Sequence, residues 1–407
     1  MVELLHNKLL LRISMRFLCS QGLEATRATG PSVHRRCHVR TPEFKVNTKE
    51  YFGGSSAGSF INQVRTAVRQ KLGLSNPGPT ERHTLSTGQC SLGKQQENID
   101  IILPARSKAD QLLGIYWDSV YPLYPFVDQQ ETLFKYRALW DGHQQTEGDR
   151  LFVCLLNVIF ALSCQLNGAI EAERREASAR VYFQRAKALL DLWSSGSFQC
   201  VQVHLLLTQF FQSTNEPQQC WMMVGVAVRT AQSLGLHLPE TTKQVSSPRR
   251  RELMRKIWHG CILMDRVTSM TYGRPPMISA TLAAVVPRPL PIDEELLPQE
   301  EDQPAPDPTG PSILDFFVQT LELYEILFDV LVGFYSSSSG VDLSVDDIWA
   351  RHLGPSAISS NSSILHVERR LIKWEAQLPP HLRLAETSPG VQSTSPFFRQ
   401  AVILHQR

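Results

Sequence analysis

The sequence lacks an apolar run long enough to cross a membrane. No stretch approaches the roughly 20 uncharged apolar residues that a membrane-spanning helix needs. The leucines near the N-terminus are interrupted by Lys8, Arg12 and Arg16, whereas the apolar region of a secretory leader is continuous. The sequence therefore predicts a protein without membrane partners, and an Arg-rich organelle presequence stays open as an alternative.

Motifs for catalysis and cofactor binding are also missing. The chain has no His-Glu-x-x-His, no Walker loop and no dinucleotide-binding fingerprint. It does contain a formal Gly-x-Ser-x-Gly around Ser56, but a nucleophile elbow needs a buried strand before it and a parallel sheet around it. The chain shows almost no strand periodicity. We therefore predict no catalytic residues and no enzyme, and keep a serine hydrolase using Ser56 as a remote alternative to a flexible glycine–serine turn.

The cysteines form neither a zinc-binding nor a disulfide pattern. The chain has 8 of them at irregular spacings, and no Cys-x-x-Cys occurs. Several lie in apolar stretches with helical spacing, which predicts reduced, buried thiols in a nuclear or cytosolic protein. A zinc site built from Cys19, His34, Cys37 and His38 fits no zinc-ligand spacing, so we predict no metal site.

Charge is unevenly distributed although the net charge is only +2. Residues 1–95 carry 14 Lys+Arg against 5 Asp+Glu, and the remainder carries 27 against 34. Such a basic arm is typical either of contact with nucleic acid or of a solvated, poorly ordered segment. Residues 73–98 are rich in Gly, Pro, Ser, Thr and Gln, which indicates a linker. We therefore predict a basic, largely disordered region over 1–100 and a folded domain over 101–407.

Helical periodicity begins near Ser107 and continues to the end of the chain. Short loops between successive helices predict an all-α, multi-helix antiparallel array. An acidic, proline-rich loop at 287–311 interrupts the array, and we interpret it either as solvated or as a contact for an effector or partner. The predicted helices cover residues 150–166, 171–193, 198–212, 312–335 and 364–378, and a further helix begins at 396.

Two further helices, between Cys220 and Ile278, carry the most specific signals. The first helix should end at Gly235, because glycine adopts the left-handed C′ conformation without strain, and Pro239 should prevent it from resuming. Ser247 is placed as the N-cap of the second helix, with Pro248 at its first position. We predict that one apolar stripe of each helix faces inward, and that the two helices dock as the buried centre of the body. The stripes are Trp221, Val224, Val228 and Ala231, and Leu253, Ile257, Cys261, Met264 and Thr268.

This helix pair resembles the core of the fungal-specific regulatory domain, or middle homology region, of zinc binuclear cluster transcription factors. That family carries a Trp-x-x-x-Gly-x-Ala-x-Arg-x-Ala-x-x-Leu-Gly-Leu-His helix, followed by a second helix with an arginine run, Trp, Asp-Arg and Gly-Arg-Pro. We interpret the charged motif residues as a polar joint between helices, and keep an effector pocket as the alternative. The matching residues here are Trp221, Gly225, Arg229, Gly235, His237, Arg250, Trp258, Asp265, Arg266, Gly273, Arg274 and Pro275.

The resemblance implies a nuclear transcription regulator whose helical body restrains or licenses activation. Family members bind DNA through six closely spaced cysteines that hold two zinc ions, and that cluster is not found in these 407 residues. We therefore expect no cofactor in this chain, and DNA contact only through a missing cluster or an intact partner. A homodimer, a heterodimer, a small-molecule effector and a coregulator protein all stay open. Family members normally continue past this point with more helices, so we expect a truncated C-terminus; a non-catalytic helical adaptor or scaffold is the alternative reading.

Overall fold

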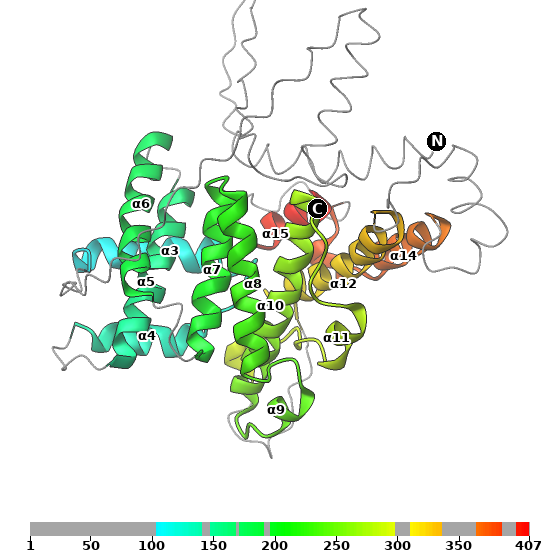
Figure 1. Cartoon of the computed structure of the whole chain (residues 1–407), viewed down its shortest axis with the longest axis horizontal. Helices are drawn as coiled ribbons and strands as arrows, with labels where there is room; N and C mark the ends of the chain where they lie inside the picture. Colours follow the sequence, from blue (N-terminus) through cyan, green and yellow to red (C-terminus); the bar gives the residue numbers. More distant parts are fainter. Residues whose placement is uncertain are drawn as a thin grey trace, which may run out of the picture.

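Every regular element in the described part of the chain is helical, and none of its residues lies in a strand (Figure 1). The computed structural model describes residues 103–140, 147–167, 171–190, 196–297, 310–335, 364–384 and 396–406. The all-α prediction is confirmed. The predictions for the basic N-terminal region and Ser56, and for the last residues of the 171–193 helix, fall outside the described residues. None of the described helices is both long enough and apolar enough to span a bilayer.

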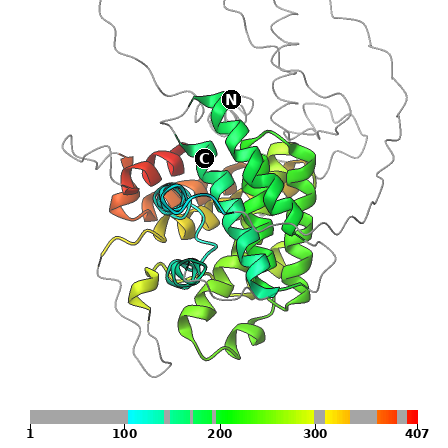
Figure 2. The same ribbon diagram turned by 90° about the vertical axis from the view of Figure 1, so that its left-hand side faces the viewer.

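The first half of the body has two crossed layers. Helices α3 and α4 run across the molecule, whereas α5 to α8 stand upright beside them, as the end-on view of α3 and α4 in Figure 2 makes clear. Helix α5 packs against α3, α6 and α7, and α7 packs against α8. The bounds are α3 (Arg106–Ser119), α4 (Gln129–Ala138), α5 (Glu147–Leu166), α6 (Ala172–Leu189), α7 (Phe198–Ser213) and α8 (Pro217–Ser233).

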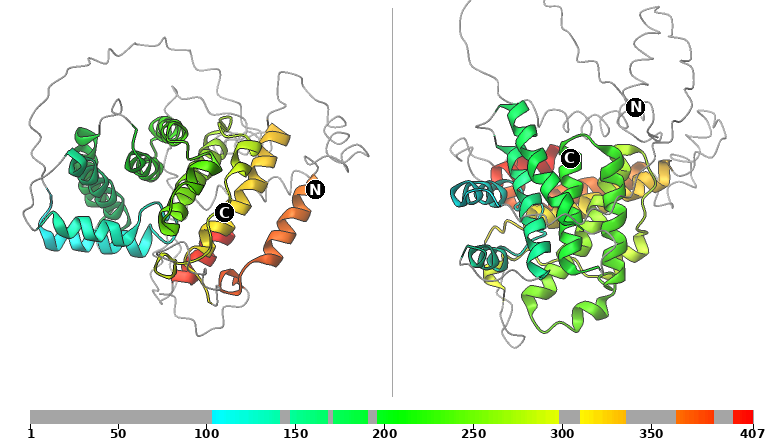
Figure 3. Two further views of the ribbon diagram at one scale, coloured as in Figure 1. Left: turned by 90° about the horizontal axis from the view of Figure 1, so that it is seen from below. Right: turned by 60° about the vertical axis from the view of Figure 1, so that its left-hand side comes forward.

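The second half of the body packs against α8 through one long helix. Helix α10 (Pro248–Tyr272) packs against α8 on one side and against α12 (Asp315–Val330) on the other. Beyond α10, α12 and α14 lie side by side (Figure 3). The remaining elements are α9 (Pro239–Lys243), α11 (Ala280–Val285), η1 (Glu294–Leu296), η2 (Leu331–Tyr335), α14 (Ile364–Gln377), η4 (Pro380–Leu382) and α15 (Pro396–Gln406).

The core is continuous from α3 to α12. All residues of α7 from Cys200 to Phe211 are buried, and α5 is buried on most sides, as its sequence predicts. A smaller apolar cluster joins α12, η4 and α15 through Phe316, Leu382 and Leu404. Five cysteines of the described residues are free and buried, in agreement with the prediction of reduced thiols: Cys154, Cys164, Cys200, Cys220 and Cys261.

The predicted ends of the two central helices are confirmed. Gly235 has a φ of +70° just after α8, and Gly273 has a φ of +65° at the C-cap of α10. The Ser247 hydroxyl accepts a hydrogen bond from the Arg250 N–H at 3.3 Å and thereby caps α10. The inward stripe predicted for α10 is buried throughout.

Some local predictions need correction. Pro239 starts α9 instead of preventing a helix, because proline fits the first helical position without losing a hydrogen bond. The short helices α4 and α11 were not predicted at all. Residues 312–314 form a turn before α12, and η2 then extends α12 as a π-helix to Tyr335.

Candidate functional site

A buried ion pair joins α10 to the chain that follows it. Arg266 Nη1 donates to Asp265 Oδ2 at 2.8 Å, and Arg266 Nη2 donates to the carbonyl of Ile278 at 2.5 Å. Asp265 also accepts the backbone N–H groups of Met277 and Ile278 at 3.0 and 2.9 Å. The Arg266 guanidinium lies 3.8 Å from the centroid of the Phe328 ring on α12. The pair therefore fixes the turn after Gly273 and contacts α12.

Burial shifts the ionisation of both partners. It raises the pKa of the Asp265 carboxyl, although the backbone donors and Arg266 oppose that shift. It lowers the pKa of the Arg266 guanidinium to about 10, which still leaves the side chain cationic at neutral pH. The ion pair is thus maintained by its hydrogen bonds against a desolvation cost.

Two more polar residues of α10 hold the returning chain further along. His259 Nε2 lies 3.1 Å from the Val286 carbonyl and 3.0 Å from the Pro287 carbonyl, so this nitrogen must be the donor. Burial lowers the pKa of His259 to about 4, and the ring is therefore neutral near pH 7. Glu252 Oε2 accepts the N–H of Leu290 at 2.8 Å. Together these contacts keep residues 286–290 against α10.

Glu294 completes this set of contacts where η1 meets the start of α10. Lys256 pairs with Glu294, and Arg249 Nη2 lies 3.5 Å from the same carboxylate. Arg249 also binds Asp128 through two hydrogen bonds of 2.5 and 2.7 Å, while Asp128 caps α4. The acidic segment is therefore docked inside the body at Glu294, which neither interpretation of the 287–311 loop had anticipated. We call the contacts that residues 249–266 of α10 and residues 277–294 make with each other, with the start of α4 and with α12 the α10 seam.

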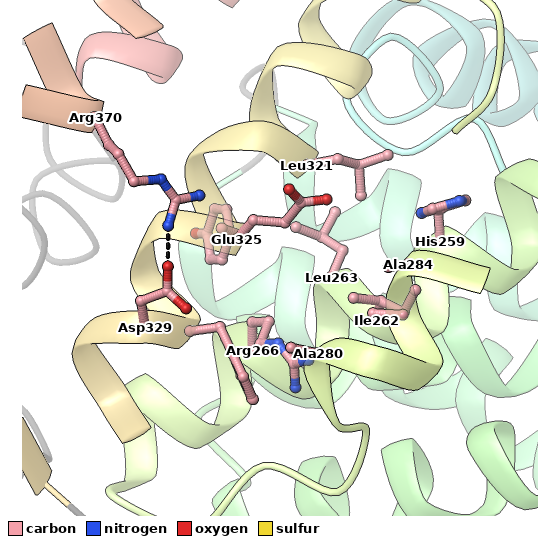
Figure 4. A pocket seen from close by; sticks show the side chains of 13 residues that line it. His259, Ile262, Leu263, Arg266, Ala280, Ala284, Leu321, Glu325, Asp329 and Arg370 are labelled. Atoms are coloured by element: carbon pink, nitrogen blue, oxygen red, sulfur yellow. Dashed lines mark hydrogen bonds and ion pairs between the residues drawn. The ribbon is translucent and has the colours of Figure 1, made fainter. Parts of the chain in front are cut away.

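A cavity of about 220 Å³ lies beside the α10 seam, between α10, α11 and α12 (Figure 4). Its apolar lining includes Ile262 and Leu263 from α10, and Leu321 from α12. Arg370 reaches from α14 to pair with Asp329 of α12 at one end of the cavity (Figure 4). Four helices therefore meet around one small, partly open space.

The predicted motif residues are distributed over several places, and only Arg266 lines this cavity. Trp258 is fully buried, with the His237 ring 5.9 Å away, and Arg274 lies over the Trp221 ring at 5.3 Å. These contacts belong to the α8–α10 side of the body and are separate from the cavity.

The remaining motif residues lie nearer the surface. Arg250 lies 4.0 Å over the Phe198 ring, whereas the exposed Arg229 contacts Gln232 of its own helix. Gly225 has no atom near the position that a Cβ would take, and Pro275 is exposed. Gly235 and Gly273 act as the helix ends described above.

The family motif does not include most residues of the α10 seam. A signal for them does exist in the sequence, because polar residues recur along α10 at spacings of three, four and seven. That spacing places them on one helix face, and a polar stripe on a helix predicted to be buried needs partners. The stripe consists of Arg249, Glu252, Lys256, His259 and Arg266.

The family model for the fungal specific transcription factor domain matches residues 113–376. This chain belongs to that family. The match includes all of α10 and the whole α10 seam, so the seam lies within the part of the chain that defines a fungal transcription factor domain. No solved structure matches the chain.

Several relatives of this fungal transcription factor domain are named as regulators. The sorbicillinoid biosynthetic cluster transcription factor 2 of Penicillium rubens is 30% identical over 272 residues, covering 63% of this chain and 38% of the relative. The sorbicillinoid biosynthetic cluster transcription factor sor3 of Hypocrea jecorina is 36% identical over 235 residues, covering 53% and 34%. The transcription factor FBD3 of Gibberella moniliformis is 25% identical over 319 residues, covering 76% and 39%. The chain thus spans less than two fifths of these relatives' length.

Proposed function

We propose that this chain is the regulatory body of a fungal transcription regulator and acts in the nucleus without catalysing a reaction. The observation that carries the proposal is the family match over residues 113–376, supported by relatives that are named as transcription factors. DNA contact would come from a zinc cluster on a partner or on sequence outside these 407 residues. The body itself would need no cofactor.

The α10 seam supplies the mechanism that we propose. Its contacts connect α4, α10, η1 and α12, so a change at one of these elements alters the packing of the others. A molecule or protein that binds one packing more tightly than another shifts the population toward that state. Such a shift would change which surfaces are exposed to coregulators or to a second subunit, and would thereby restrain or license activation.

A reporter assay tests the role in transcription. The full chain, fused to a heterologous DNA-binding module and a fluorescent tag, is expected to accumulate in the nucleus and to change reporter expression several-fold relative to the module alone. A tagged chain that stays in the cytoplasm and leaves the reporter unchanged would instead identify a helical adaptor.

A matched pair of arginine variants tests the α10 seam in the same assay. Arg288 links the returning chain to α12 through Glu322 and Glu325, at 2.6 and 2.7 Å, and is 38% exposed. Arg288→Ala should alter reporter output while the protein level is maintained. Arg180→Ala removes a similar exposed ion pair, with Glu176 on α6, and should leave the output unchanged. If the two variants change the reporter output equally, the α10 seam has no specific role in the proposed mechanism.

A further inference from the structure

The cavity beside the α10 seam has the size of a small ligand. Its volume of about 220 Å³ exceeds the roughly 150 Å³ of an engineered cavity that binds benzene, and is smaller than the roughly 300–1,000 Å³ of pockets for drug-sized molecules. An occupant of roughly ten non-hydrogen atoms, such as a fused pair of small rings, matches that space.

The walls are mainly apolar. Helix α10 contributes Ile262 and Leu263, and α12 contributes Leu321, all of which are buried in the protein. Helix α11 lines the opposite side with alanines, including Ala283 and Ala284. Small side chains on α11 leave the space open, since a larger residue at either position would project into it. This lining favours an apolar occupant through burial of its surface.

The charged groups around the cavity already have partners. Arg266 pairs with Asp265 at 2.8 Å, Glu325 pairs with Arg288 at 2.7 Å, and Asp329 pairs with Arg370. The His259 Nε2–H is used by two backbone carbonyls. A charged ligand would therefore find no free counter-charge in this lining, and would gain less from it than a neutral apolar molecule does.

From size, lining and charge together, we propose that this cavity binds a neutral, mainly apolar molecule of roughly ten non-hydrogen atoms. Because the cavity is bounded by α10, α11 and α12 and ends at the Arg370–Asp329 pair, the occupant contacts elements from both sides of the α10 seam. The proposal rests on the proposed function only in naming this occupant as an effector. Binding itself is measured without a transcription assay.

Calorimetry with indole as a neutral two-ring probe tests the proposal on the full chain. We expect a dissociation constant on the order of 100 µM, which lies within the affinities that ligands of about ten non-hydrogen atoms reach. Indole-3-acetate, which adds a carboxylate, should bind at least tenfold more weakly. Ala283→Leu should also weaken indole binding at least tenfold, because the larger side chain fills the cavity.

The matched control is Ala177→Leu, the same substitution at an exposed position of α6, which should bind indole like the parent. Thermal unfolding checks that each variant is folded, and Ala284→Leu serves as a second cavity-filling variant if Ala283→Leu does not fold. Absence of indole binding at millimolar concentration would overturn the proposal. Binding that both filling variants leave unchanged, or tighter binding of indole-3-acetate, would do the same. The reporter result stands independently of each of these outcomes.

Discussion

Lys256 of α10 and Glu294 of η1 form an ion pair whose side chains are only 2% and 6% exposed. The two residues are separated by 38 positions in the sequence. Glu294 also accepts the N–H of Gln129, at the start of α4, at 3.4 Å. One carboxylate therefore holds η1 against two helices. Loss of its main cation would leave a buried carboxylate whose remaining cationic neighbour, Arg249, is 3.5 Å away.

A double-mutant cycle on this pair measures the strength of the contact. Lys256→Met should lower the free energy of unfolding by about 3 kcal/mol, because Glu294 remains buried without its main counter-charge. Adding Glu294→Gln should recover part of that loss, with a coupling energy of about 2 kcal/mol in urea titrations. The Lys135–Glu131 pair on α4, in which both side chains are 46% exposed, is the control and should couple by less than about 1 kcal/mol. Similar coupling in the two cycles would contradict a structural role for Glu294.

Asp265→Asn should be among the most destabilising single substitutions in the α10 seam. The change leaves the Arg266 guanidinium without its anion and weakens the hydrogen bonds from Met277 and Ile278. We expect the free energy of unfolding to fall by about 3–5 kcal/mol in chemical denaturation. Asp118→Asn at an exposed position of α3 should change it by less than about 0.5 kcal/mol. A small effect of Asp265→Asn would mean that the turn after Gly273 is held by packing alone.

His204 makes stability depend on pH. It is 3% exposed on α7, and neither ring nitrogen has a hydrogen-bond partner among the described residues. Burial lowers the pKa of His204 to about 4 from an ordinary value of 6.5. Between these two values the unfolded chain binds a proton that the folded chain does not, so stability falls as the pH is lowered, by up to about 3 kcal/mol.

His204→Leu should remove that contribution. The variant should lose less stability than the parent between pH 6.5 and pH 4, and should gain about 1 kcal/mol at pH 7 because an unpaired polar ring is replaced by an apolar side chain. Urea titrations of both proteins across this range make the comparison. His259, whose pKa is lowered to about 4 as well, keeps part of the slope in the variant. Identical pH profiles would show that His204 is not buried as a neutral ring.

The sequence predicted the ends of the central helices well because capping depends on neighbouring residues. Ser247 and Gly273 carry their signals within one helical turn, and the structure confirms both. Helix α4 had a comparable signal that was overlooked, since Asp128 caps the helix and Glu131 follows three residues later. Short helices with little apolar periodicity are detectable only through such caps.

The α10 seam and the cavity were less predictable. Local periodicity marks a polar stripe on α10, but it does not name the partner of each side chain. Arg249 binds Asp128 at a separation of 121 positions, and nothing near either residue indicates the other. The cavity depends on alanines of α11 facing α12, an arrangement that follows from how the returning chain docks. Long-range pairing therefore limits what a single sequence predicts here.

Replacing either of two glycines of the central motif by alanine should change the free energy of unfolding, in opposite directions at the two positions. Gly235 has a φ of +70°, where a Cβ is strained, and its added Cβ would lie 2.8 Å from Thr241 Oγ1. Gly235→Ala should therefore lower the free energy of unfolding by about 1–2 kcal/mol. Gly225 lies inside α8 with no atom within 4 Å of an added Cβ, so Gly225→Ala should raise it by about 0.5–1 kcal/mol by restricting the unfolded chain. Urea titrations of both variants decide the matter: if Gly225→Ala also destabilises the protein, the space beside α8 must be occupied in solution, and Gly225 then marks a contact surface.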